Sequence, residues 1–519
     1  MAVSMSSPGS AAPRREPIDL DRLTMADVRA GALEGRHVTV LGLARSGISL
    51  ARFLLGAGAV VTGYDGRPLE TLSPAVADLA EQGLTVVAGP AVDPAGTWRE
   101  ADLVTTSPSI NADFPTTEPR LRDALRRLAA ARAGAPGTPA LVSEPDLFLR
   151  LCPSPTVGIT GTKGKTTTSA LTATLLAADE THPAVLGGNI GVPLIERLPE
   201  LTPAHRVVIE LSELQLPTLS RGTTLAVYTN VTADHLDRHG SLEDYRSAKR
   251  RLSQLVDPDG LLVLNGDDPL VAGYGEGARA RVVTYRLGAP EVGGLGIADL
   301  DDGQWIVADP LGKIMPTAEL QIPGRHNVSN AMAAVAVGLY FDLPPETIRA
   351  AARGFTGVEH RLERVAEIDG TRFVNDSQGT QPDAVIAALR AFEPPIVLIA
   401  GGRDKGIDLS PLGPVVADRV AAAVLIGESG PHLARLFRSS GLEHVERAAS
   451  LEEAVRRAAA IAHDLRVAAA AGHQLKPTAT VLLSPAAASF DMFVDYEARG
   501  RAFKKAVAEL AELAEANGR

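Results

Sequence analysis

The stretch Val157-Gly158-Ile159-Thr160-Gly161-Thr162-Lys163-Gly164-Lys165-Thr166-Thr167-Thr168 decides the fold of the middle of this chain. An apolar run with strand character ends in a glycine-rich turn, and an Ala/Leu-rich helical pattern follows it. Glycines let backbone N–H groups approach phosphates, and a helix N-terminus adds partial positive charge. Lys165 is placed to reach the β- and γ-phosphates, and the Thr166 hydroxyl to face Mg²⁺. The pattern predicts a site for a nucleoside triphosphate.

The spacing of this loop differs from the usual Gly-x-x-x-x-Gly-Lys-[Ser/Thr]. It is shorter, because position 159 is not glycine, and residues 160–167 read Thr-Gly-Thr-x-Gly-Lys-Thr-Thr. The alternative is a glycine-rich turn with a solvated lysine. The strand and helix patterns on either side argue against that alternative.

Length and composition are typical of a soluble globular protein of about three domains, with 519 residues, 45% hydrophobic and 22% charged. The net charge of −11 argues against a general nucleic-acid binder. The sequence has no long uncharged apolar run, so a membrane span is not expected. The first residues lack the apolar region of a secretory signal, and we expect a disordered tail at 1–18. A single cysteine, Cys152, excludes an internal disulfide and fits the cytoplasm.

The N-terminal part reads as a Rossmann-like βαβ unit. A strand pattern at residues 37–41 runs into the turn Gly42-Leu43-Ala44-Arg45-Ser46-Gly47, and a second strand pattern ends at Asp65, 23 positions after Gly42. Ala44 replaces the glycine that lets a pyrophosphate lie against the backbone. A dinucleotide is therefore disfavoured, and a differently held nucleotide-like ligand remains open.

Strand-like and helix-like patterns alternate along most of the chain, which predicts α/β architecture with largely parallel sheets. Boundaries are expected near residues 130–139, rich in Ala, Gly and Pro, and near residues 354–358. Short apolar runs that end in glycine or polar turns, at 372–376, 395–402, 424–427 and 481–484, predict a third, doubly wound domain. Residues 454–478 are expected to form a surface helix and loop.

Two strand ends beyond the phosphate loop carry candidate ligands. Residues 207–212 deliver Glu210 to the carboxyl end of a strand, where a carboxylate suits Mg²⁺. A structural salt bridge is an equally good interpretation of Glu210. His235 follows the strand pattern at 226–231, and with His239 it invites a zinc site. The loop-like flanks and the absence of His-Glu-x-x-His favour His235 alone, close to Glu210, and by sequence alone Lys249 is one of many exposed lysines.

These motifs and others resemble the Mur ligase family, in family order from about residue 37 to 505. The matching segments are Thr160–Thr167, Gly187–Gly191, Glu210–Gln215, Asn230–His235, Gly324–Ala331, His360-Arg361, Asn375–Ser377, Gly401–Lys405 and Leu483–Phe493. Each motif is modest alone, whereas the ordered set is highly specific.

The resemblance implies three α/β domains. They are a Rossmann-like UDP-binding domain at 19–145, a central P-loop ATPase domain at 146–357 and a Rossmann-like amino-acid-binding domain at 358–519. It implies an ATP-dependent ligase that adds D-glutamate to UDP-N-acetylmuramoyl-L-alanine through an acyl phosphate, in peptidoglycan precursor synthesis. We expect a cytoplasmic monomer with no membrane or nucleic-acid partner.

Residue roles in ATP and Mg²⁺ binding follow from the resemblance, motif by motif. The ATP-binding set is Gly161, Thr162, Lys163, Gly164, Lys165, Thr166, Thr167, Asn327, Asn330, Arg361 and Asp376. The metal set is Thr166, Glu210, His235 and Lys249, of which Lys249 matches a lysine that the family carbamylates into an anionic ligand. Lys165, Glu210, His235, Lys249 and Arg361 would carry catalysis, and Arg361 would bring charge to the γ-phosphate on domain closure.

Substrate-binding residues follow in the same way. The set for the UDP-substrate is Ala44, Arg45, Ser46, Gly47, Asp65, Arg67, Ser107 and Asn189, and the set around glutamate is Thr380, Lys405, Ser489 and Tyr496. Ala44 fits this interpretation, because the turn would then meet UDP rather than NAD. Lys405 suits a substrate carboxylate, since charge-assisted hydrogen bonds are strong.

Three departures from the family pattern concern fine substrate geometry, including the stereochemistry of the amino acid. The familiar Ser-Ser-Phe-Gln reads Ser-Glu-Leu-Gln at 212–215, Gln378 replaces a lysine, and Tyr496 stands where phenylalanine is common. Because of these departures, a ligase that adds L-glutamate stays an alternative.

Other functions remain as alternatives. They are another Mur ligase, a folylpolyglutamate synthase, which lacks the Rossmann-like first domain, and a P-loop ATPase that drives transport or assembly. An NAD-dependent oxidoreductase fails on Ala44 and leaves the phosphate loop unexplained.

Overall fold

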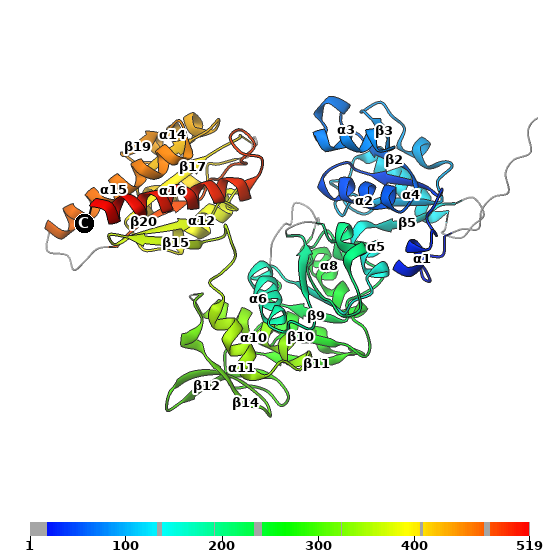
Figure 1. Ribbon diagram of the computed structural model, residues 1–519, viewed down its shortest axis with the longest axis horizontal. Coiled ribbons are helices and arrows are strands. Elements are labelled where there is room, and N and C mark those ends of the chain that lie inside the picture. The colour runs from blue at the N-terminus through cyan, green and yellow to red at the C-terminus, as the bar shows by residue number, and fades with distance from the viewer. Residues whose placement is uncertain are drawn as a thin grey trace, which may run out of the picture. The chain divides into compact units, whose positions relative to one another are not determined.

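Three sheets with flanking helices make up the described part of the chain (Figure 1). The computed structural model describes residues 18–131, 138–190, 193–232, 241–322, 324–404, 408–471 and 478–517. Residues 1–355 form one compact unit, which holds the first two sheets, and residues 356–519 form a second unit with the third sheet. The α/β fold class predicted from the sequence is confirmed.

The first sheet has five parallel strands in the order β3-β2-β1-β4-β5. Its strands and helices are β1 (His37–Leu41), β2 (Val60–Asp65), β3 (Thr85–Ala88), β4 (Leu103–Thr106), β5 (Ala140–Ser143), α1 (Met25–Arg29), α2 (Arg45–Gly56), α3 (Pro74–Glu81) and α4 (Pro119–Ala130). The chain switches direction across the sheet between β1 and β4, and ligands of such folds bind at the carboxyl ends of the strands there.

The central sheet has nine strands in the order β14-β13-β12-β11-β10-β9-β6-β8-β7, of which β13 pairs antiparallel with β12 and β14. Its strands are β6 (Thr156–Thr160), β7 (Ala184–Gly188), β8 (Arg206–Glu210), β9 (Leu225–Tyr228), β10 (Leu261–Asn265), β11 (Arg281–Tyr285), β12 (Leu295–Leu300), β13 (Gly303–Ala308) and β14 (Gly312–Pro316). Its helices are α5 (Glu144–Leu151), α6 (Lys165–Ala177), α8 (Leu242–Leu255), α9 (Pro269–Ala272), α10 (Arg325–Tyr340) and α11 (Pro345–Gly354). The direction switch lies between β6 and β9.

The third sheet has six strands in the order β15-β16-β20-β17-β18-β19, with β15 antiparallel to β16. Its elements are β15 (Glu363–Ile368), β16 (Thr371–Asn375), β17 (Ile396–Gly401), β18 (Val420–Ile426), β19 (Val445–Arg447), β20 (Ala479–Leu483), α12 (Pro382–Arg390), α13 (Leu412–Arg419), α14 (Gly430–Ser439), α15 (Leu451–Ala471) and α16 (Tyr496–Asn517). Six short 3-10 helices complete the described elements: η1 (Leu69–Thr71), η2 (Pro94–Trp98), η3 (Leu194–Glu200), η4 (Leu216–Thr218), η5 (Gly273–Gly275) and η6 (Thr317–Glu319).

Strand β17 shows why this third sheet is covered on both faces. Ile396 and Leu398 pack into one core cluster with α12, α13 and α14, whereas Val397 and Ile399 pack into another with α15 and α16. Successive side chains of a strand point to opposite faces, so a continuous apolar run needs a helical layer on each side. The strands predicted from these apolar runs are present in one sheet with helices on both faces.

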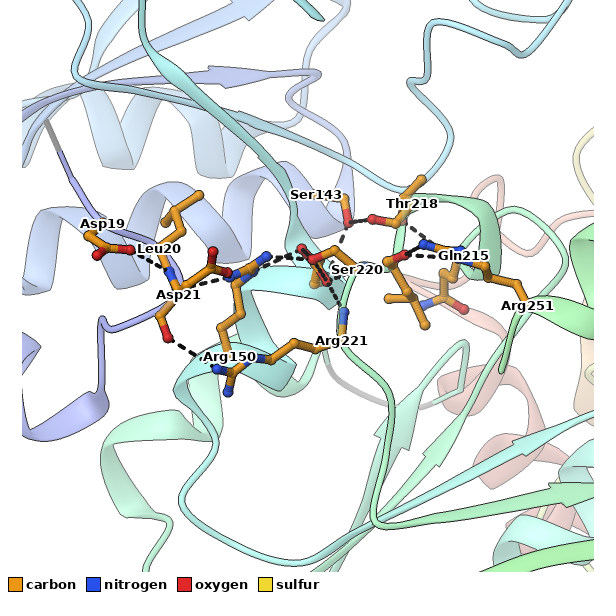
Figure 2. A network of polar contacts seen from close by, with 12 residues as sticks. Asp19, Leu20, Asp21, Ser143, Arg150, Gln215, Thr218, Ser220, Arg221 and Arg251 are labelled. Carbon is orange, nitrogen blue, oxygen red and sulfur yellow. Dashed lines mark hydrogen bonds and ion pairs between the residues drawn. The ribbon is translucent and has the colours of Figure 1, made fainter. Parts of the chain in front are cut away.

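Within the first unit, a polar network joins the start of the described chain to α5 and to the loop that follows η4 (Figure 2). Arg150 of α5 pairs with Asp146 at 3.0 Å and with Asp21, near the start of the described chain, at 2.7 Å. Asp146 in turn accepts hydrogen bonds from the backbone N–H groups of Ser220 and Arg221. The loop that follows β8 and η4 is therefore fixed to α5.

Among the described residues, no helix is both long enough and apolar enough to cross a membrane.

Candidate active site

The phosphate loop leaves β6 at Thr160 and enters α6 at Lys165. Gly161 has φ +148° and Gly164 φ +87°, conformations that favour glycine. A Cβ on Gly161 would collide with the Thr229 hydroxyl, and one on Gly164 would lie 2.5 Å from Asn330 Oδ1. Both positions therefore need glycine, because the loop passes close to Thr229, which follows β9, and to Asn330 of α10.

The end of β9 holds this loop from the side. The Thr162 N–H donates to the Asn230 carbonyl at 2.7 Å, and the Lys163 N–H donates to Asn230 Oδ1 at 2.9 Å. The Thr229 hydroxyl donates to the Lys163 carbonyl at 2.6 Å. Because β6 and β9 flank the switch point of the sheet, the loop lies where ligands of α/β sheets bind.

The first turn of α6 has the features of an anion site. Its N-cap, Gly164, makes no side-chain capping bond, which leaves N–H groups of the first turn for a ligand. The side chain of Lys165 folds back onto the loop, and its ammonium donates to the carbonyls of Gly161 and Thr162, both at 3.0 Å. Thr166 lies in the same turn and is buried. Asn330 of α10 also lies beside the loop, and its amide donates to Asn327 Oδ1 at 3.1 Å.

Lys249 lies in α8 and is fully buried, in contrast to the exposed position expected from sequence alone. Its ammonium donates to the Gly161 carbonyl at 2.9 Å and to the Thr160 hydroxyl at 3.3 Å. The Tyr245 hydroxyl, one turn earlier in α8, lies 2.8 Å from Thr162 Oγ1. The structure thus brings Lys249 to the base of the phosphate loop.

Glu210 ends β8 and is buried, only 2% exposed. Its Oε1 accepts from the Asn189 amide at 3.0 Å, and the Asn189 N–H donates to the Glu210 carbonyl at 2.9 Å. Its Oε2 is buried and has no hydrogen-bond partner within the described part of the chain. A buried carboxylate oxygen without a partner is costly, so this atom is placed for a cation.

The first sheet builds a second site at the Gly42–Gly47 turn. Asp65, at the end of β2, accepts from the Leu43 N–H at 2.9 Å and from the Arg67 guanidinium at 2.8 and 3.0 Å. Burial would raise the pKa of Asp65, but the hydrogen bonds from Arg67 and the Leu43 N–H, together with the charge of Arg67, outweigh it and hold the pKa below its ordinary value. The carboxylate is therefore ionised.

A pocket of about 440 Å³ opens beside this turn. It is lined by Leu43, Ala44, Arg45, Ile48, Ser49, Arg52, Arg67, Ser73, Pro193 and Glu196. The N-cap of α2, Ala44, makes no side-chain capping bond, so this helix start also offers N–H groups to an anion. A Cβ on Gly42 would lie 2.9 Å from Ser107 Oγ, which places Ser107 against the turn. The turn, Asp65, Arg67 and Ser107 therefore lie close together in the structure.

The second unit has its own cluster at the ends of β16 and β20. Asp376 Oδ2 accepts from the Ser484 hydroxyl at 2.7 Å, and Oδ1 accepts from the Leu362 N–H at 3.2 Å. Burial raises the pKa of Asp376 to about 7, against the opposing effect of its Ser484 hydrogen bond. Arg361 is exposed and lowers that pKa slightly through its charge.

Arg499 of α16 ties two loops of this cluster together. The residue is 1% exposed, and its guanidinium donates to the hydroxyl and carbonyl of Ser377, at 3.0 and 2.9 Å, and to the carbonyls of Ala487 and Ala488. The Ser377 hydroxyl donates to the Tyr496 carbonyl at 2.7 Å. Burial lowers the pKa of Arg499 to about 10, which still leaves it charged at neutral pH.

Three predicted substrate positions lie near the segments that Arg499 contacts. Ser489 is buried directly after Ala488, Thr380 follows the Asp376–Gly379 loop, and Tyr496 begins α16. His235 and Lys405 lie outside the described residues. Sequence reasoning missed Tyr245 and Arg499, which carry no recognisable local pattern and act only through contacts between distant segments.

Comparison with known proteins identifies the chain. A family model described as the Mur ligase middle domain matches residues 159–338, and one described as Mur ligase, glutamate ligase domain matches residues 360–487. The UDP-N-acetylmuramoylalanine--D-glutamate ligase of Symbiobacterium thermophilum is 38% identical over 487 residues, which cover 93% of this chain and 100% of that protein. The protein of the same name from Pelotomaculum thermopropionicum is 37% identical over 92% of this chain and 98% of its own length.

The chain belongs to the Mur ligase family. Among solved structures, a UDP-N-acetylmuramate-alanine ligase from Thermotoga maritima matches with a TM-score of 0.52 and 18% identity, over 91% of this chain and 99% of that one. That likeness supports the shared fold. Mur ligases are ATP-dependent enzymes that use Mg²⁺.

The residues present fit both ATP and Mg²⁺. The glycine cradle and the uncapped start of α6 suit the ATP phosphates, with Lys165 as the neighbouring cation. The partnerless Glu210 Oε2 and the hydroxyl of Thr166 offer the oxygen ligands that Mg²⁺ prefers. Bound Mg²⁺ would supply charge neutralisation on the phosphates.

Proposed function

We propose that this Mur ligase adds D-glutamate to UDP-N-acetylmuramoyl-L-alanine, with ATP cleaved to ADP and phosphate. The observation that carries the proposal is the similarity along nearly the whole chain to ligases of that name, at 37–38% identity. Such similarity spans all three sheets and not the phosphate loop alone. We further propose that the reaction takes place in the cytoplasm and that the enzyme is a monomer.

The reaction needs ATP because a carboxylate does not accept an amine directly, since oxide is a very poor leaving group. A carboxylate oxygen of the UDP-substrate attacks the γ-phosphorus, and ADP leaves with the bonding electrons. The glutamate amine nitrogen then attacks the carbonyl carbon of this acyl phosphate. Phosphate leaves, the amine loses a proton, and an amide remains. The protein contributes mostly positioning and charge stabilisation.

Roles within the first unit follow from the contacts at the loop. Gly161 to Thr167 would hold the phosphates, and Lys165 would exchange its contacts with loop carbonyls for contacts with phosphate oxygens. Glu210 would bind Mg²⁺ through Oε2, together with Thr166. Lys249 would join them as a carbamate, formed when its neutral amine attacks CO₂ and loses a proton. His235 is proposed as a further ligand from its motif alone.

Substrate positions complete the proposal. The Gly42–Gly47 turn, Asp65, Arg67 and Ser107 would bind the UDP part, supported by the pocket beside them. Asn189 would face the muramoyl part. Asp376, Asn327, Asn330 and Arg361 would contact the nucleotide, and Thr380, Lys405, Ser489 and Tyr496 would surround the glutamate.

L-glutamate as the acceptor is the second candidate, because Gln378 and Tyr496 depart from the family pattern at the acceptor end. The test is an assay of ADP release with UDP-N-acetylmuramoyl-L-alanine and either glutamate enantiomer, together with controls that lack one substrate. We expect ADP only when the UDP-substrate and D-glutamate are both present. Turnover with L-glutamate alone would assign the other enantiomer, and ADP release without any substrate would favour a simple ATPase.

A further inference from the structure

Tyr228, the last residue of β9, reaches from the central sheet to helix α8. Its side chain is fully buried, and its hydroxyl donates to the Lys249 carbonyl at 2.7 Å and accepts from the Ser253 N–H at 2.9 Å. Residues 249 and 253 are four apart, the spacing of partners in one turn of a regular α-helix. A single hydroxyl therefore contacts both ends of the turn that begins at Lys249.

The side chain of Lys249 extends from this turn to the phosphate loop. Its ammonium donates to the Gly161 carbonyl and the Thr160 hydroxyl, as described above. The backbone of Lys249 is thus fixed on one side by Tyr228, and its side chain on the other by the loop. Any shift of this turn along the axis of α8 changes the position of the ammonium.

Tyr228 is also linked to the loop through its own strand. It pairs in register with Thr160, the last residue of β6, and the two residues after it, Thr229 and Asn230, hold Lys163 by hydrogen bonds. The Tyr285 hydroxyl donates to the Tyr228 carbonyl at 2.9 Å. One short stretch of chain, residues 228–230, therefore contacts both α8 and the phosphate loop.

Packing alone does not account for this hydroxyl. An apolar side chain would fill the same space without the cost of burying a polar group. The hydroxyl donates to the Lys249 carbonyl while it accepts from the Ser253 N–H, so both its donor and its acceptor capacity are used. Its two bonds go to the turn whose side chain reaches the phosphate loop.

We propose that Tyr228 is a positioning residue, whose hydroxyl sets the distance between Lys249 and the phosphate loop. The proposal rests on the proposed function only in that Lys249 acts at the Mg²⁺ site. It adds a residue whose own side chain is directed to α8 and acts on the site through Lys249.

The test compares Tyr228→Phe with Tyr274→Phe. Tyr274 is also buried, packs edge-on against Tyr228 at 5.2 Å between ring centres, and has its hydroxyl 3.4 Å from the Arg246 carbonyl of α8. Both changes remove one hydroxyl that contacts α8, but only the first concerns the Lys249 turn. Tyr274→Phe is therefore the matched control.

Two kinds of measurement are needed. In Tyr228→Phe we expect kcat to fall ten- to hundredfold, the size of effect that misplacement of about 1 Å produces, and the KM for Mg²⁺ to rise. The KM for the UDP-substrate should stay within twofold, because its turn lies on the first sheet. Independently of activity, acetylation of the folded protein followed by mass spectrometry should label Lys249 at least tenfold faster in this variant, with Lys163 unchanged.

Three results would overturn the proposal. The first is a kcat and a rate of Lys249 labelling in Tyr228→Phe that stay within twofold of the native enzyme. The second is an equal fall in kcat and an equal rise in labelling in Tyr274→Phe, and the third is an equal rise in the KM of every substrate and of Mg²⁺. If the native enzyme had no ligase activity, the proposed function would fail, whereas the labelling would still test the positioning. If Tyr228→Phe did not fold, hydrogen exchange of the native protein would decide. The Ser253 amide should exchange at least tenfold more slowly than that of Leu252, which is also buried in the same helix. Equal rates would show that the Tyr228 hydroxyl does not fix this turn.

Discussion

Asp376→Asn tests whether the carboxyl of Asp376, a proposed nucleotide contact in the second unit, is protonated in the native protein. Asp376 is 4% exposed, and its two hydrogen bonds, from the Ser484 hydroxyl and the Leu362 N–H, do not fully offset burial of its charge. Its pKa therefore rises from the ordinary 3.8 to about 7. Asparagine has nearly the same shape but does not titrate.

The sign and size of the effect follow from this shift. Between about pH 4 and pH 7 the native state keeps the proton while the unfolded chain releases it, so the free energy of unfolding decreases as the pH rises. Above about pH 7 both states are ionised and the loss is complete. A shift of about three pKa units corresponds to about 4 kcal/mol. Relative to the native protein, Asp376→Asn should therefore gain about 4 kcal/mol of stability between pH 4 and pH 8.

The measurement must report on the second unit alone, because a chain of several domains does not unfold in one step. Amide hydrogen exchange of β17 and β20, corrected for the intrinsic effect of pH, gives the opening free energy of this unit. Asp408→Asn is the control, since hydrogen bonds from the Ser410 N–H and hydroxyl lower the pKa of that exposed carboxyl. Its small effect should run in the opposite direction.

A constant difference between Asp376→Asn and the native protein over this pH range would refute the reasoning, because the carboxyl would then be ionised at pH 4 in the native state. A difference that changes in favour of the native protein as the pH rises would refute it as well.

Three further variants test the two sites of the first unit. Lys165→Ala should abolish turnover while calorimetry shows unchanged binding of the UDP-substrate, and loss of both in a folded variant would contradict the separation of the sites. Gly164→Ala should weaken ATP binding at least tenfold, since φ of +87° costs a side chain about 1–2 kcal/mol and the new Cβ would lie 2.5 Å from Asn330 Oδ1; normal affinity by calorimetry would show that the loop adapts. Arg67→Ala should raise the pKa of Asp65, measured by NMR titration, and an unchanged pKa would mean that Arg67 does not hold it down.

The architecture was predictable because its signals are local. Apolar strand patterns that end in glycine or polar turns predicted β1, β6, β16, β17 and β20, and Gly42, Gly161 and Asp376 directly follow β1, β6 and β16. The rule that ligands bind at these ends of parallel strands then brings such residues into candidate sites. The αL conformation of Gly164 and the carboxylate contact of Asp65 to Leu43 agree with the two turn motifs.

Contacts between distant segments were not predictable from one sequence. Lys249 lies in a helix whose local pattern gives no sign that its ammonium is buried 88 residues from Gly161 in the chain. Arg499 reaches Ser377 across 122 residues, and nothing near either residue indicates the pair. Tyr228 lies in the strand pattern at 226–231, which gives no sign of its contact with α8, because burial and the partner of a hydroxyl depend on which helix packs over the strand.

The fate of the carboxylate oxygen tests the central claim most directly. UDP-N-acetylmuramoyl-L-alanine labelled with ¹⁸O in its terminal carboxylate is converted with ATP and D-glutamate in unlabelled water, and the released phosphate is analysed by mass spectrometry. Transfer of the γ-phosphoryl group to the carboxylate predicts one ¹⁸O in each phosphate, carried over when the amine displaces it. Phosphate without label, formed at the rate of ADP, would show transfer to water and would contradict the account.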